Sequence, residues 1–203
     1  MNASKPGPRP GSPGADSPFA VLAEEHALIL RATDLLERGL CRLEAGTPIG
    51  RTFFTELAEF FQAFADRYHH GKEEHILFPF MVEEMDYPQK SGPIAVLSSD
   101  HTMGRAHVRA MADAAARLEL EPAVAQELAP RGQAYVALLR AHIDREDHKV
   151  FPTVEDFLGP DEQAHLGTAF AEFEAAEGGA CTAAKYAEMV AALEREVGRS
   201  EHS

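Results

Sequence analysis

The chain has 203 residues, 45% of them hydrophobic, so it can bury the core of one domain. Its 19 basic and 33 acidic residues give a formal net charge of −14, which argues against nucleic acids and anionic membranes as partners. We find no apolar run long enough for a bilayer and no apolar signal-peptide core at the N-terminus, so we expect a cytoplasmic protein.

The N-terminal part of the chain divides into a predicted tail and a predicted helix. Residues 1–15 are rich in Pro, Gly and Ser, which cannot form a packed core and predict a disordered tail. Ser17 and Pro18 are typical of a helix start, because proline at the first helical position has no N–H to leave unpaired. This helix should run to about Ala45 and carry His26 near its apolar stripe, which is formed by Val21, Leu22, Ile29, Leu36 and Leu40.

A second helix is predicted after residues 46–48, with phenylalanines first and then His69 and Glu73 at helical spacing. Pro79 cannot donate a backbone hydrogen bond and frees the carbonyl of His75, and Pro152 does the same later in the chain. We therefore expect a kink or a loosened turn one turn beyond the polar residues of both helices.

The second half of the chain begins after a loop at residues 87–93. One helix there carries His101, and the next, after residues 121–122, should kink or start again at Pro130 before it reaches His142 and Glu146. Residues 159–160 end this part. Two further amphipathic helices are predicted within residues 159–203, as a lid, an extension of the core or an oligomer surface.

The two cysteines, Cys41 and Cys181, form no C-x-x-C motif and indicate neither a disulfide framework nor a thiolate zinc site. We expect both to be small buried side chains.

An internal repeat connects the two halves. Residues 68–79 align without gaps with residues 141–152, at an offset of 142 − 69 = 73. His69 thus matches His142, and Glu73 matches Glu146. In each copy the His and Glu are four residues apart, so they share one face of a helix. With one further histidine upstream in each half, the pattern predicts an all-α, up-down-up-down four-helix bundle built from two helix-hairpin repeats. The inward-facing candidates are His26, His69, Glu73, His101, His142 and Glu146.

This pattern resembles the hemerythrin-like, or HHE cation-binding, domain, whose members hold a non-haem di-iron centre in such a bundle. The resemblance covers about residues 18–158, and we assign residues 16–158 to the bundle and 159–203 to a C-terminal helical extension. It implies the same six residues as ligands, with the two glutamates bridging both irons. Oxygen-carrying hemerythrins have a fifth histidine one turn after the first histidine of the third helix. That position is Arg105 here, so we expect a more open or more carboxylate-rich centre.

The register of the ligands has an alternative, because His70 and Glu74 also form an i, i+4 pair. The repeat aligns them with Ile143 and Asp147, so only the register of His69 keeps a histidine in both halves. Asp147 could instead serve as the carboxylate at five-residue spacing from His142. We expect Glu74 and Asp147 to accept hydrogen bonds from ligand imidazoles. We interpret the remaining histidines as surface or hydrogen-bonded residues: His75, His107, His148, His165 and His202.

The ligand types favour iron and also suit zinc or manganese, and the resemblance indicates two iron ions. Three functions remain open: an O2-linked carrier or sensor, an oxidoreductase acting on peroxide or nitric oxide, and an iron-handling or interaction protein. No extra acid–base pair or redox cysteine lies near the motifs. We therefore expect a di-iron protein that binds O2, another diatomic or peroxide, rather than an enzyme, with a homo-oligomer surface on its C-terminal helices.

Overall fold

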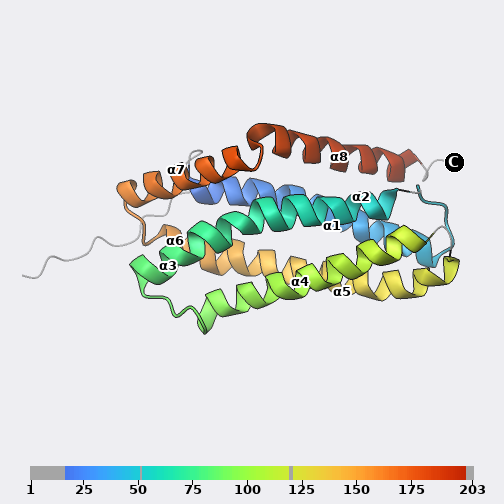
Figure 1. Cartoon of the computed structure of the whole chain (residues 1–203), viewed down its shortest axis with the longest axis horizontal. Coiled ribbons are helices and arrows are strands. Elements are labelled where there is room, and N and C mark those ends of the chain that lie inside the picture. The colour runs from blue at the N-terminus through green and yellow to red at the C-terminus, as the bar shows by residue number, and fades with distance from the viewer. Residues whose placement is uncertain (1–16, 51, 119–120, 200–203) are drawn as a thin grey trace, which may run out of the picture.

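The computed structural model describes residues 17–50, 52–118 and 121–199, and within these ranges the protein is helical without any strand (Figure 1). The predicted tail at residues 1–15 lies outside the described residues. The first helix, α1 (Pro18–Glu44), starts where the sequence predicts, and the Ser17 side chain accepts a hydrogen bond from the Phe19 N–H. None of the described helices is both long and apolar enough to cross a membrane.

The second helix changes its winding along its length. It begins as α2 (Phe53–Phe60), continues as the π-helical segments η1 (Phe61–His70) and η2 (Glu73–Leu77), and ends as α3 (Phe78–Met85). π-Helical turns are rare and occur often at functional sites.

The fourth helix repeats part of this pattern. It consists of α5 (Ala125–Arg145), η4 (Glu146–Val150) and α6 (Phe151–Glu155), preceded by the short 3₁₀ segment η3 (Pro122–Val124). The prediction of a new start at Pro130 is wrong, because α5 runs through that proline from Ala125.

The loosened turns lie closer to the polar residues than we predicted. The Phe78 N–H bonds to the Glu73 carbonyl, and the Phe151 N–H to the Glu146 carbonyl, each five residues back. The next residue in each case is a proline, which cannot continue the α-helical ladder. In the fourth helix the widened winding therefore begins at Glu146 itself, and in the second helix it begins still earlier, at Phe61, before it resumes at Glu73.

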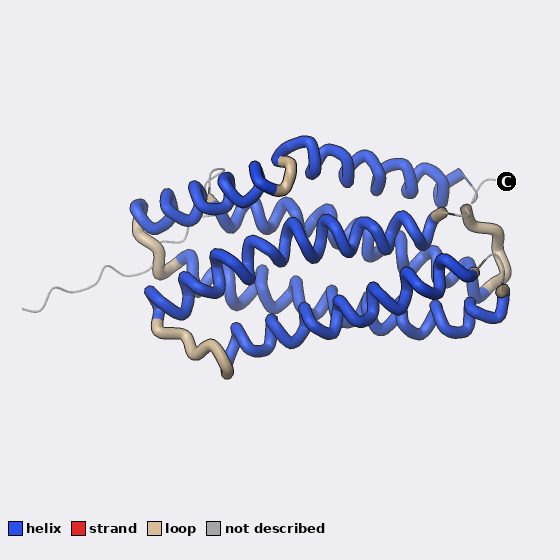
Figure 2. The backbone as a smooth tube through the Cα atoms, in the orientation of Figure 1, coloured by secondary structure: helices blue, strands red, loops and turns tan. Residues whose placement is uncertain are grey.

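The long helices of the bundle lie side by side (Figure 2). The third helix, α4 (Gly92–Arg117), packs on α5 and α2, and α1 packs on α5 and α2. Two C-terminal helices, α7 (Pro160–Ala176) and α8 (Gly179–Arg199), lie along α1 and the second helix.

Two apolar cores occupy the interior on either side of a polar layer. The larger core extends from Ile29 to Val197 in sequence and includes three other residues of α8, and the smaller core includes Leu166 and Phe170 of α7. Both C-terminal helices thus contribute to the interior. Cys41 and Cys181 are exposed, so the expectation that both are buried is wrong.

Candidate metal centre

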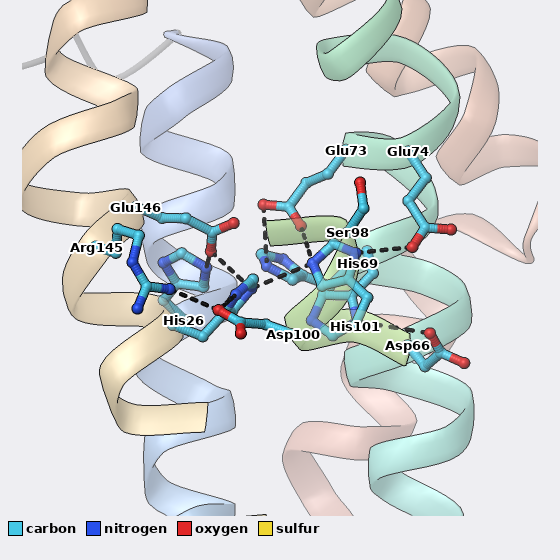
Figure 3. Close-up of polar contacts among 12 residues, drawn as sticks. His26, Asp66, His69, Glu73, Glu74, Ser98, Asp100, His101, Arg145 and Glu146 are labelled. Carbon is cyan, nitrogen blue, oxygen red and sulfur yellow. Dashed lines mark hydrogen bonds and ion pairs between the residues drawn. The ribbon is translucent and has the colours of Figure 1, made fainter. Parts of the chain in front are cut away.

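The six residues selected from the repeat meet in the polar layer between the two apolar cores. Figure 3 labels five of them: His26, His69, Glu73, His101 and Glu146. They come from α1, η1, η2, α4, α5 and η4. Each has at most 2% of its surface exposed: His26, His69, Glu73, His101, His142 and Glu146. The structure therefore gathers every predicted site residue at one buried place.

These side chains form two groups whose nitrogen and oxygen atoms lie within 4.8 Å of one another. The group that we call the first position contains His26, His69, Glu73 and Glu146. The group that we call the second position contains His70, Glu73, His101 and His142. Glu73 belongs to both, so its carboxylate lies where it can touch two ions.

The Nε2 atoms of the predicted imidazoles point inward. His26 Nε2 lies 3.2 Å from Glu146 Oε2, and His142 Nε2 lies 3.1 Å from the same oxygen. His101 Nε2 lies 3.3 Å from Glu73 Oε2 and 3.2 Å from His142 Nε2. Glu146 therefore contacts a histidine of each position.

His70 is the residue that the sequence analysis set aside when it chose the register of His69. Its ring stacks on that of His101 with centroids 3.8 Å apart, and it is 6% exposed. Neighbouring residues on a regular α-helix face different directions, but η1 is π-helical up to His70, and both His69 and His70 reach the site. The expected loss of an imidazole at Arg105 is thus offset by His70, and our expectation of a more open centre no longer follows from Arg105.

A carboxylate faces the outer nitrogen, Nδ1, of His69 and of His142. His69 Nδ1 lies 2.8 Å from Glu25 Oε2, and His142 Nδ1 lies 3.6 Å from Asp100 Oδ2. Each of these acids directly precedes a predicted histidine in the chain. The repeat of this acid–His pair was a signal that sequence reasoning could have used.

Basic residues hold the same acids in place. The Nζ of Lys72, which is fully buried, donates to Glu25 and, at 2.6 Å, to Glu174 of α7. Arg145 Nη1 donates to Asp100 Oδ2 at 2.5 Å. Lys72 and Arg145 are also equivalent in the repeat, because 145 − 72 = 73.

Two other acids link the halves of the chain. Glu74 Oε1 lies 2.7 Å from His101 Nδ1, and Asp147 Oδ1 lies 2.7 Å from His26 Nδ1. The prediction that Glu74 and Asp147 accept hydrogen bonds from these imidazoles is confirmed. Such contacts orient the ring and leave Nε2 for an ion.

Arg105 supports the second position from outside. Its guanidinium donates to Asp66 Oδ1 at 2.8 Å and to Glu74 Oε1 at 2.7 Å. Asp66 Oδ1 lies 3.5 Å from His70 Nδ1, and Glu74 bonds to His101. Arg105 thus fixes the two carboxylates behind two neighbouring imidazoles.

Burial and close charges shift the pKa values in the metal-free protein. Burial lowers the pKa of His26, but its contacts with Asp147 and Glu146 outweigh this effect and raise the pKa to about 10. Burial holds the pKa of His69 and of His70 well below the ordinary value, so both rings are neutral at neutral pH.

The carboxyls of the two positions respond in opposite directions. Burial, and then the charge of Glu146, raise the pKa of Glu73. Burial also raises the pKa of Glu146, but His142 and His26 outweigh it and lower that pKa. The metal-free site therefore divides its charge unevenly between two buried carboxyls.

The residues fit a pair of cations. Ten buried side-chain nitrogen and oxygen atoms have no hydrogen-bond partner within the described ranges, and all except Arg42 Nε belong to the two positions. Buried polar atoms are rarely left unpaired, because each costs about 1–3 kcal/mol. Cations would satisfy the imidazole Nε2 atoms and the carboxylate oxygens among them, and a set of imidazoles and carboxylates without thiolate suits iron, zinc or manganese.

Three of the remaining histidines lie at the surface, as expected, and His107 is half-buried. His75, His148 and His165 are exposed and belong to neither position. His148 lies beside Asp144, with Nδ1 3.2 Å from its carboxylate. His202 lies outside the described residues.

In comparison with known proteins, residues 17–154 match the family described as Hemerythrin HHE cation binding domain. The chain is also 26% identical to uncharacterized protein Mb2018 of Mycobacterium bovis and to uncharacterized proteins MT2051 and Rv1995 of Mycobacterium tuberculosis. Each of these alignments covers 87% of this chain and 69% of the relative. No solved structure gives a significant match.

Proposed function

Because the chain belongs to the hemerythrin HHE cation-binding domain family, we propose that it holds two non-haem iron ions and binds O2 at one of them. The observation that carries the proposal is the pair of buried donor groups that share Glu73. We take His26, His69, Glu73, His101, His142 and Glu146 as ligands, add His70, and assign both glutamates as bridges between the ions.

The two positions differ in a way that supports binding of an added ligand. The first position offers two imidazoles, and the second offers three. With both glutamates assigned as bridges, an ion in the first position would receive donors from four residues and an ion in the second from five, so the first would have more of its coordination sphere open to O2. We assign O2 binding to the first position for this reason.

Two ferrous ions, when bound, would supply the open coordination and the electrons for O2 chemistry. The chain's own contribution is orientation and exclusion of water. Acids at Nδ1 hold the rings of His26, His69 and His101 with Nε2 inward. The two apolar cores on either side keep bulk water from the site.

We also propose that the bundle is an up-down-up-down assembly of two helix-hairpin repeats. The π-helical segments η2 and η4 begin at repeat-equivalent glutamates, since 146 − 73 = 73. The acids before the single histidines and the bases within the motifs recur as well. We still expect a homo-oligomer that forms through the outer faces of α7 and α8, which light scattering would test. A cytoplasmic location also stays a prediction.

The deciding experiment is anaerobic reconstitution with ferrous iron. Metal per chain is counted, and the near-ultraviolet and visible spectrum is recorded before O2 is added, after it is added and after its removal under vacuum. We expect two irons per chain and a band that appears with O2 and disappears without it. Irreversible oxidation would instead favour an oxidoreductase acting on peroxide or nitric oxide, and no iron uptake would refute the proposal.

A further inference from the structure

A cavity of about 300 Å³ lies beside the second position, between the second helix, α4 and α5. His70 and His101 line it on the side of the candidate metal centre. Asp66 and Arg105, which support the imidazoles of the second position, also line it, and the rest of its wall comes from residues with no role in the proposed di-iron site. The cavity is therefore a separate place for a ligand, adjacent to the centre.

The size of the cavity exceeds what O2 needs. One water occupies about 30 Å³ of liquid, so 300 Å³ corresponds to roughly ten waters. Pockets that bind small organic molecules start at about this volume. The space fits a molecule with one small ring and a short polar group.

The walls combine an apolar surface with one buried donor. Phe61 and Tyr135 line the cavity with rings packed edge to face, 4.9 Å between centroids, and Gly104 and Val108 complete the apolar part. Tyr135 is 3% exposed, and its hydroxyl has no hydrogen-bond partner among the described residues. Burial raises the pKa of Tyr135, so the phenol keeps its proton and can donate a hydrogen bond.

The charge around the cavity is opposite in sign to that of the whole chain. Arg105 and Arg109 line it, against one acid, Asp66. Arg105 is already bound to Asp66 and Glu74, whereas Arg109 is exposed at the rim. An anionic group would thus meet a net positive lining in a protein of net charge −14.

We propose that this cavity binds a small aromatic carboxylate, whose ring lies against Phe61 and Tyr135 and whose carboxylate accepts from the Tyr135 hydroxyl and meets Arg109. This binding is distinct from O2 binding at the first position and needs no metal. It places an organic anion against the two stacked imidazoles His70 and His101.

The test uses the metal-free full chain and benzoate as the probe, followed by calorimetry and by nuclear magnetic resonance. We expect saturable one-to-one binding, weaker binding of acetate, which is too small, and no binding of benzylammonium, which has the wrong charge. Tyr135→Phe should weaken benzoate about fivefold to tenfold, as for the loss of one hydrogen bond.

Two further variants locate the binding. Gly104→Phe should fill the cavity and abolish binding, because a Cβ there has only ordinary contacts, the nearest at 3.4 Å to the Tyr135 ring. Arg109→Glu, at an exposed position that does not threaten folding, should weaken benzoate severalfold. Arg131→Glu is the matched control, because Arg131 is exposed on α5 outside the cavity. This variant should bind benzoate as tightly as the wild type.

Three results would overturn the proposal: no saturation with benzoate, equal affinity for benzylammonium, or unchanged binding in both Gly104→Phe and Arg109→Glu. Metal content is measured separately on iron-loaded samples of the same variants. A chain that binds benzoate but no iron would refute the proposed function alone. A chain that binds two irons but no benzoate would refute this inference alone.

Discussion

Replacing His70 with leucine should stabilise the metal-free protein and destabilise the metal-loaded one. In the metal-free chain His70 is buried and neutral, and neither ring nitrogen has a hydrogen-bond partner among the described residues. Leucine removes both unpaired atoms, and the adjacent cavity gives room for its different shape. In the loaded chain the same change removes one of three imidazoles from the second position.

The two effects have comparable sizes. An unpaired buried polar atom costs about 1–3 kcal/mol, and the lost stacking of His70 on His101 is worth about 0.5–1.5 kcal/mol. Two unpaired atoms at about 1–3 kcal/mol each, less the lost stacking, leave a net gain of at least about 0.5 kcal/mol without metal, or a melting temperature higher by at least about 1–2 °C for a chain of this length. A second ion at a hundredfold excess over its dissociation constant adds about 2.7 kcal/mol, which the variant would forgo.

Calorimetric melting of both forms, together with counting of metal per chain, measures the crossover. His148→Leu is the matched control, because His148 is exposed and outside both positions, and it should change either form by less than about 0.5 kcal/mol. A metal-free His70→Leu protein that melts below the wild type would show that the packing of His70 outweighs its unpaired atoms, and a variant that keeps two tightly bound ions would show that His70 is not a ligand.

Other changes probe the rest of the centre. Glu73→Ala should remove both ions, because Glu73 belongs to both positions, and one retained ion per chain would show that it is not shared. Arg105→His should lower the affinity for the second ion about 10–100-fold, because it releases the two carboxylates that lie behind the imidazoles. Competition with a chelator measures this affinity, and tighter binding would mean that the new histidine is itself a ligand. His26 and His101 have pKa values raised to about 10 and about 9 in the metal-free protein, where burial lowers them but neighbouring carboxylates prevail. The stability that these two protonated imidazoles contribute is complete below the ordinary pKa of 6.5 and is lost as pH rises from there through the folded pKa values of about 9 and about 10. The metal-free melting temperature should therefore fall between pH 6.5 and about 10, and a flat profile would contradict these shifts.

Local sequence determined the helices and the inward-facing residues. A histidine and a glutamate four apart share a helix face wherever the helix is placed, and a repeat offset of 73 marked both copies. The same alignment identified Glu74 and Asp147 as partners of imidazoles, which the distances of 2.7 Å confirm. The two prolines, Pro79 and Pro152, also predicted a loosened turn, although not the residue at which it begins.

Only the tertiary structure decided which other groups complete the centre. His70 enters through a π-helical stretch, whose wider winding no spacing rule for α-helices includes. Glu25 meets Lys72 and His69 across two helices, and Glu174 reaches Lys72 from α7, more than a hundred residues away. The cavity beside Tyr135 likewise exists because three helices meet there. A sequence pattern fixes the face that a residue occupies on its own helix, whereas partners across helices depend on how the helices pack together.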